Sequence, residues 1–151
     1  MNWTKLSVAT TLAAALIGSP AKAYADPVPT IDEVVAVMAK LTDPGIPAMN
    51  KGDVVTPGLA PDEAGLVDDH LNSLNSRGYL PFNFVVTDIQ PAPGNTAGAT
   101  VAVPGDFLHY SVHPVPIVLV NQSGHWLINH DAAMVFLNTM RSDTNHRGWA
   151  K

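Results

Sequence analysis

The hydrophobic positions near the start of the folded region recur with the spacing of an α-helix. Thr30 and Glu33 are three residues apart and form a capping-box pattern, which satisfies two backbone N–H groups at a helix start. Apolar side chains then recur on one face, and the chain breaks at Asp43-Pro44-Gly45. We expect a helix whose buried stripe is Ile31, Val34, Val35, Met38 and Leu41. On this assignment, Val35→Asp unfolds the domain because it places an unpaired charge in the core.

A second helical pattern follows a loop rich in proline and glycine. Residues 46–61 hold three prolines and two glycines and are expected to form a packed loop. The second helix is expected to begin near Pro61, with Asp62 and Glu63 at its positive end, and to stop at Gly78. Its predicted buried face consists of Leu66, Val67, Leu71 and Leu74.

From residue 82 onward the apolar period changes to that of β-strands. In the first segment Phe82, Phe84 and Val86 alternate with other residues, and a turn follows at residues 91–95. Residues 121–124 have the composition of a hairpin turn between two later strands. The four predicted strands are Phe82–Ile89, Ala97–Val103, Val115–Val120 and His125–Ile128.

A last helix and a polar tail complete the pattern. Asn129 or Asp131 can cap this helix, whose apolar face is formed by Ala133, Phe136, Leu137 and Met140. Helices followed by an antiparallel meander and a closing helix indicate an α+β fold, with helices packed on a curved four-stranded antiparallel sheet. Such an arrangement makes a cone-shaped or cystatin-like domain. We expect one domain over residues 26–141 and a flexible tail over residues 142–151.

The first 25 residues have the organisation of a secretory signal peptide. Lys5 gives a short positive region, residues 6–18 form an uncharged apolar run, and Ala23-Tyr24-Ala25 is a small-x-small cleavage pattern. The apolar run is shorter than the roughly 20 residues of a membrane-spanning helix. We therefore expect cleavage after Ala25, secretion, and no membrane span in the mature chain.

Composition narrows the classes of function. The 151 residues include no cysteine, which excludes disulfides, a thiol nucleophile and thiolate metal ligands. The net charge of -5 disfavours nucleic-acid binding, which normally needs a basic face. We expect no nucleic-acid partner and no cofactor.

Among the carboxylates, Asp88 is the clearest candidate for a chemical role. It is expected on the same strand face as Phe84 and Val86, where an apolar environment raises a carboxyl pKa and favours proton abstraction. Such a base needs a second polar group nearby, for which His70, Tyr79 and Tyr110 are the candidates. The interpretation that we favour is that Asp88 lies at the strand end and caps the following turn, where aspartate is common.

The histidines and serines form no catalytic or metal-binding pattern. The six histidines, at positions 70, 109, 113, 125, 130 and 146, lack the spacing of ligands that converge on one ion, so no metal site is predicted. His70 lies beside the apolar face of the second helix and is expected to pack at the core edge. No nucleophile elbow and no glycine-rich phosphate loop is present.

Three segments resemble a known family. Leu41–Gly58, Val85–Ala92 and Ile117–Leu137 are similar, in this order, to segments of the secreted low-molecular-weight antigen family of mycobacteria and related actinobacteria, and the resemblance covers residues 30–141. It implies an exported, cysteine-poor culture-filtrate antigen that T cells recognise, with a cystatin-like or nuclear-transport-factor-like fold. It implies no catalytic residues. The very short segment before the first helix and the charged tail after Met140 depart from the family's pattern.

Three hypotheses for function follow. The first is a secreted, non-enzymatic domain that binds a protein partner or a small apolar ligand in the mouth of the cone, with Asp88, His70 and Tyr110 as candidate ligand contacts. The second is an isomerase-like or lyase-like enzyme with Asp88 as its base. The third, a cystatin-type protease inhibitor, ranks last because the chain lacks the Q-x-V-x-G hairpin.

Overall fold

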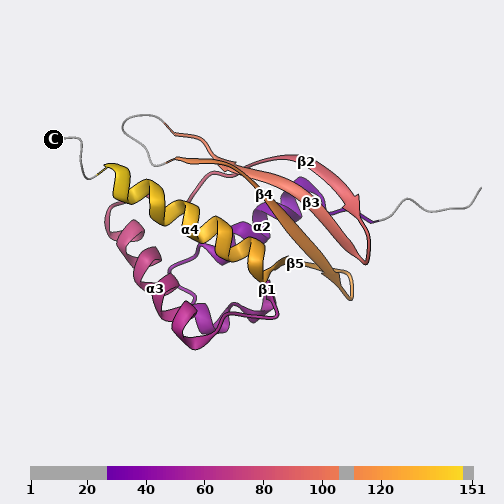
Figure 1. The fold of residues 1–151 in the computed structure, drawn as a ribbon, viewed down its shortest axis with the longest axis horizontal. Coiled ribbons are helices and arrows are strands. Elements are labelled where there is room, and N and C mark those ends of the chain that lie inside the picture. Colours follow the sequence, from indigo (N-terminus) through magenta and orange to yellow (C-terminus); the bar gives the residue numbers. More distant parts are fainter. Residues whose placement is uncertain (1–26, 106–110, 148–151) are drawn as a thin grey trace, which may run out of the picture.

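A computed structural model describes residues 27–105 and 111–147, with side chains described as far as Arg141. Figure 1 shows helices lying against a twisted sheet. In chain order the elements are α2 (Ile31–Leu41), the 3-10 helix η2 (Ala48–Asp53), β1 (Val55–Thr56), α3 (Pro61–Ser76), β2 (Val85–Ala92), β3 (Thr96–Val103), β4 (Val112–Gln122), β5 (His125–Asn129) and α4 (His130–Arg147). This element order confirms the predicted α+β class.

The sheet has five strands rather than the four predicted, in the order β1-β5-β4-β3-β2. Strands β2 to β5 form the expected antiparallel meander. The additional strand β1 pairs in parallel with β5, with Val55 opposite Ile128. Because β1 has only two residues and lies within the proline-containing loop, no periodicity could identify it.

Several element boundaries differ from the predicted ones, and those of β2 and α4 change how residues were assigned. β2 begins at Val85, so Phe82 and Phe84 precede the strand, although Phe82 is buried. α4 continues to Arg147, so the predicted tail from Ser142 begins within the helix. Asn129 caps α4, since its Oδ1 accepts a hydrogen bond from the Asp131 N–H at 2.9 Å. The predicted signal peptide, residues 1–25, lies outside the described residues.

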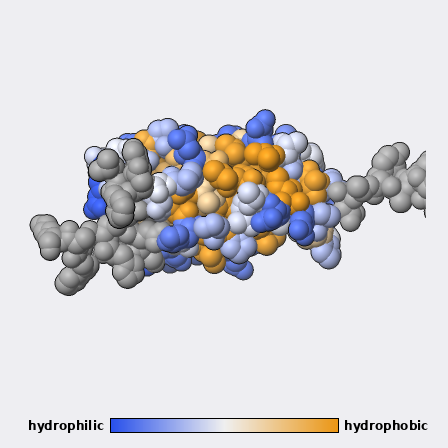
Figure 2. Space-filling view, turned by 90° about the horizontal axis from the view of Figure 1, so that it is seen from above, coloured by the Kyte–Doolittle hydropathy of each residue, from blue (hydrophilic) through white to orange (hydrophobic). Residues whose placement is uncertain are grey.

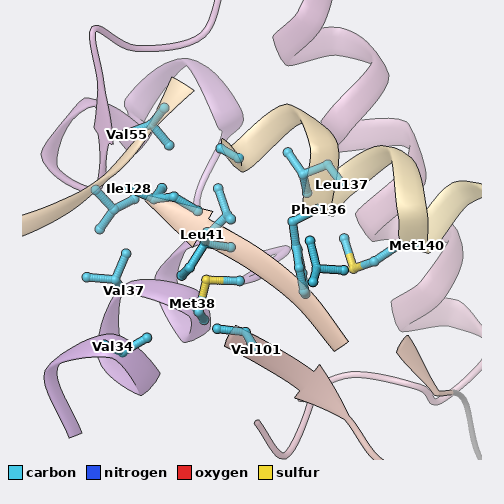
Figure 3. Packing of buried hydrophobic residues seen from close by; sticks show 14 of the residues in the cluster. Val34, Val37, Met38, Leu41, Val55, Val101, Ile128, Phe136, Leu137 and Met140 are labelled. Carbon is cyan, nitrogen blue, oxygen red and sulfur yellow. The ribbon is translucent and has the colours of Figure 1, made fainter. Parts of the chain in front are cut away.

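The core lies between one face of the sheet and the helices. Figure 3 shows side chains from α2, α4 and the sheet meeting there, with Met38, Val101 and Phe136 among them. Met38, Val101 and Phe136 are completely buried. Burial of this apolar area is the main favourable term in folding.

Two predicted helix faces are rotated in the structure. In α2 the buried residues are Val34, Val37, Met38 and Leu41, whereas Ile31 is 55% exposed and Val35 is only partly buried. In α3, Leu66 is 60% exposed and Ala64 takes its place in the core. Both helices carry apolar residues over more than one stripe, and the sheet selects which stripe is buried.

Among residues 27–105 and 111–147, no helix covers the opposite face of the sheet. Val85 and Val118 lie on this outer face, since each alternates with buried neighbours along its strand, and both are nearly half exposed. Figure 2, a view from above Figure 1, shows hydrophobic residues gathered in one broad region of the surface.

Candidate functional site

A groove lies between α2, the segment before β1, and the β4–β5 hairpin. Its volume is about 550 Å³, within the range of ligand pockets. α2 contributes Glu33, Ala36, Val37 and Lys40; residues 52–54 form a second wall; and the hairpin contributes residues 122 and 124–127. The groove combines an apolar floor with a charged rim.

A buried lysine in η2 determines the course of the chain beside the groove. The Lys51 side chain is only 1% exposed, and its Nζ donates to the carbonyl oxygens of Lys40 and Asp43, each at 2.8 Å. It thereby satisfies acceptors at the end of α2, where a cation is favoured. Burial lowers the pKa of Lys51, and Asp43, Asp68 and Asp53 partly oppose that shift. The other end of η2 is held by the Ala48 N–H, which donates to Asp68 Oδ1 at 2.9 Å.

On the side of β5 away from β4, the turn of η2 leaves the residues before Ile128 without a strand neighbour in the described part of the chain. The Val54 N–H donates to the Lys51 carbonyl at 3.0 Å, so it is turned away from the sheet. The Val54 carbonyl accepts from the Ile128 N–H at 2.7 Å, and β1 pairs with β5 only from Ile128 onward. The groove therefore lies beside β5 at the residues that precede Ile128.

The groove's floor and rim differ in chemistry. Trp126 is 8% exposed and Val37 6% exposed, so both belong to the core and present little surface. Lys40 Nζ lies 3.5 Å from Asp53 Oδ2, and both side chains are more than half exposed. Glu33 Oε2 accepts the Thr30 N–H at 2.7 Å in the predicted capping box. The rim thus carries two carboxylates, one ammonium group and the exposed His125.

The hairpin wall of the groove has a defined geometry. Ser123 and Gly124 both have positive φ, at 54° and 85°, as a two-residue type I′ turn requires. The Gly124 N–H donates to Asn121 Oδ1 at 3.0 Å. Gln122 Nε2 donates to Thr56 Oγ1 at 2.9 Å, which ties the hairpin to β1.

Asp88 lies neither on the buried strand face that a proton-abstracting base would need nor at the strand end, since β2 continues to Ala92. The pairing of β2 with β3 shifts between Thr87 and Gln90, and Asp88 sits in this bulge with φ 55°. Its carboxylate is exposed, and Thr87 Oγ1 donates to Asp88 Oδ2 at 3.4 Å. The bulge breaks the alternation on which the prediction relied.

His70 belongs to α3 and lies half-buried at the core edge, beside a cavity that residues of α4 also line. Its Nε2 is buried without a hydrogen-bond partner among the described residues, beside a cavity of about 40 Å³ that Leu137 also lines. Asp88 does not line this cavity, so the two predicted site residues are not brought together. Burial lowers the pKa of His70, and the charges of Arg141 and Arg77 lower it further. Tyr79 is partly buried, and Tyr110 lies outside the described residues.

A further cavity, of about 360 Å³, is lined mainly by apolar residues, including Leu80, Phe82 and Phe84. The rings of Phe82 and Phe84 meet edge to face, with centroids 5.9 Å apart. Neither Asp88 nor His70 lines this cavity.

His130 is held between two carboxylates, a contact that has no signal in the sequence. His130 Nε2 lies 2.8 Å from Glu63 Oε2, and His130 Nδ1 lies 3.1 Å from Asp131 Oδ1. The hydrogen bond to Glu63, followed by that to Asp131, raises the pKa of His130, while the same contact with His130 lowers the pKa of Glu63. Glu63 and His130 are far apart in sequence, so only the fold brings them together. Over residues 27–105 and 111–141, no cluster of three or more His, Asp or Glu side chains could hold a metal ion.

Comparison with known proteins identifies relatives of this chain. The family described as "Low molecular weight antigen MTB12, C-terminal domain" matches residues 27–144. The chain is 36% identical over 115 residues to the low molecular weight antigen MTB12 of Mycobacterium bovis, covering 76% of this chain and 67% of that protein. It is 34% identical over 110 residues to the Mycobacterium leprae homolog, covering 73% and 65%. The chain thus spans about two thirds of the length of these relatives.

A more distant relative carries a different name. The chain is 26% identical over 113 residues to the putative lipoprotein LppK of Mycobacterium tuberculosis, covering 74% of this chain and 59% of that protein. Within the described part of this chain, no helix combines the length and hydrophobicity needed to cross a membrane.

Proposed function

Because the chain belongs to the family of the low molecular weight antigen MTB12, C-terminal domain, we propose that it is an exported domain that acts by binding rather than by catalysis. Its antigen and lipoprotein relatives support export, as does the signal-peptide pattern of residues 1–25. The resemblance also implies a cystatin-like or nuclear-transport-factor-like cone, and we assign the groove between α2 and the β4–β5 hairpin to the mouth of that cone.

The observation that carries this proposal is the groove itself. A volume of about 550 Å³ is sufficient for a small ligand or a short peptide. Its floor includes Val37 and Trp126, and its rim includes Lys40 and Asp53, so apolar contacts and oriented polar groups are both available. Backbone and side-chain hydrogen bonds fix the walls, which reduces the entropy lost on binding.

The enzymatic alternative receives less support from the described geometry. An isomerase-like base must lie in a pocket beside a second polar group. Asp88 is exposed on the β2 bulge and lines none of the three cavities, and His70 lies on a different element. This arrangement favours the binding hypothesis. A turnover assigned to the purified protein and abolished by Asp88→Asn would replace it.

A chemical-shift experiment tests the proposed groove. We would titrate isotope-labelled protein with organic extracts and size-separated fractions of the producer's culture medium. The proposal predicts saturable shifts at Lys40, His125 and Trp126, which Ala36→Trp abolishes by filling the groove. Native mass spectrometry before and after organic extraction would identify a removable adduct. Saturable shifts confined to Phe82 and Phe84, or to the outer sheet face, would contradict the assignment, as would the absence of any saturable shift.

A further inference from the structure

The edge of β5 is unpaired at Trp126. Along a strand, the backbone N–H and C=O groups of alternate residues point to the same side. The Ile128 N–H points away from β4, because it donates to the Val54 carbonyl. Trp126 precedes Ile128 by two residues, so its N–H and C=O also point away from β4, toward the groove. No backbone hydrogen bond joins them to any residue within the described ranges.

The register between β1 and β5 shows which backbone groups would pair with Trp126 if β1 were longer. With Val55 opposite Ile128, continuation of the parallel ladder would bring the Val54 N–H to the Trp126 carbonyl and the Gly52 carbonyl to the Trp126 N–H. The Val54 N–H is instead bonded to Lys51, whose buried ammonium group holds η2 against the end of α2. Where a neighbouring strand would run, the structure has the groove.

The other edge of the sheet differs from this one. β2 has a bulge at Asp88, where φ is positive, and carries Pro91, which has no N–H to donate. A bulge, an exposed charge and a proline are among the features by which proteins prevent strand addition, as is a helix or loop that covers the edge. The edge of β5 at Trp126 carries none of these three features and is bordered by α2 and the segment before β1. The two edges are therefore not equivalent as docking sites.

The charges at the rim of the groove indicate which kind of segment it can bind. Glu33 and Asp53 are opposed by one lysine, Lys40, and the chain as a whole has a net charge of -5. A segment with a lysine or arginine side chain complements this rim, whereas an acidic segment is repelled. Added strands gain affinity from main-chain hydrogen bonds and specificity from alternate side chains.

We propose that the groove accepts an extended peptide segment of a partner protein, carrying a lysine or arginine, which pairs with the backbone of Trp126 as an added strand. The inference rests on the proposed function, since it assigns an occupant to the same groove. The peptide accepts the Trp126 N–H with a carbonyl and donates an N–H to the Trp126 carbonyl. Its basic side chain faces the carboxylates of the rim.

The test selects peptides without assuming a sequence. A displayed library of random linear heptapeptides is selected on the full chain and counter-selected on Ala36→Trp. The proposal predicts enriched segments that contain lysine or arginine, and synthetic copies that protect the Trp126 amide from hydrogen exchange. N-methylation of the pairing peptide nitrogen is expected to weaken binding at least about tenfold, because one hydrogen bond is lost. Replacing the basic residue by glutamate weakens binding by a similar factor.

Matched variants keep the outcome interpretable. Ala36 and Ala39 are both exposed on α2, but Ala36 lines the groove whereas Ala39 lines the cavity of about 360 Å³, so Ala39→Trp is expected to bind the peptides like the wild type. Circular dichroism establishes that both variants fold, and the N-methylated peptide tests the pairing without any variant. No enrichment, or binding that N-methylation leaves unchanged, would overturn the inference. If a culture-medium ligand still shifts the groove resonances in that case, the proposed function stands. A dimer that protects the Trp126 amide without peptide would place a second copy on the edge and also overturn the inference.

Discussion

The Nζ of Lys51 lies 2.8 Å from the carbonyl oxygen of Lys40 and connects the end of α2 to the loop that borders the groove. One side chain thereby satisfies helix acceptors and fixes η2, whose residues Gly52 and Asp53 lie off the sheet. The opening beside β5 follows from the turn of η2, because the Val54 N–H is bonded to the Lys51 carbonyl and Val54 joins β5 only through its own carbonyl.

Removal of the Lys51 ammonium group should destabilise the domain. Lys51→Met keeps most of the apolar stem but leaves two carbonyl oxygens without their donor. We expect a loss of about 2–4 kcal/mol in the free energy of unfolding, measured with urea. Lys40→Met is the control, because its exposed ion pair with Asp53 should contribute no more than about 1 kcal/mol. Equal losses in the two variants would contradict the role given to Lys51.

The orientation of α2 predicts which of its side chains carry stability. Met38 is fully buried, so Met38→Ala should cost about 2–5 kcal/mol. Ile31→Ala should change the free energy of unfolding by no more than about 0.5 kcal/mol, because Ile31 is 55% exposed. Val35→Asp, expected from the sequence to unfold the domain, should now be milder than Val34→Asp because Val35 is only partly buried. Thermal melts of the four variants test this order.

Local patterns predicted much of the fold, and long-range contacts account for what they missed. Periodicity and capping residues placed α2, α3, the four antiparallel strands and the start of α4. They could not decide between Val35 and Val37 on α2, since both fit an apolar stripe and only the packing partner distinguishes them. β1 was not predicted because two residues have no period, and its pairing with β5 joins residues that are far apart in the sequence.

The candidate site was predicted less well than the fold. Asp88 was assigned from strict alternation, which a bulge interrupts. The groove depends on Lys51, whose burial has no signal in the sequence, because lysine is rarely buried unless paired. The hairpin was predicted, but not that the edge of β5 would lack a neighbour at Trp126. The contact between His130 and Glu63 likewise required the three-dimensional arrangement of α3 and α4.

The contact between His130 and Glu63 predicts a pH-dependent contribution to stability. The folded-state pKa of His130 is raised above 6.5, so its contribution is fully present below pH 6.5 and is lost as the pH rises through the raised pKa. The folded-state pKa of Glu63 is lowered below 4.5, so its contribution to stability is present above pH 4.5 and is lost as the pH falls through the lowered pKa. Urea unfolding of wild type and His130→Gln should differ more at about pH 5.5 than at about pH 8.5. The exposed His125→Gln serves as control, and a larger difference at the higher pH would refute the assignment.

The protonation of His70 should change stability in the opposite direction to that of His130. Its folded-state pKa is lowered below 6.5, so the unfolded chain binds the proton more tightly and acid destabilises the fold between these two values. His70→Leu should be neutral or stabilising at about pH 7.5, since it removes an unpartnered buried polar atom. It should also lose less stability than wild type on going to about pH 5. His113→Leu, at an exposed position, is the matched control, and equal acid sensitivity of His70→Leu and wild type would argue against this account.

Amide hydrogen exchange of the free protein shows directly whether the edge of β5 is unpaired at Trp126. The Leu127 N–H lies opposite Val120 in the β4–β5 ladder, and the Ile128 N–H donates to Val54. We predict that the Trp126 amide exchanges at least about 100-fold faster than those of Leu127 and Ile128, because it lacks a partner and needs no opening of the ladder. Protection of Trp126 equal to that of its two neighbours would show that the edge is already occupied and would contradict the account.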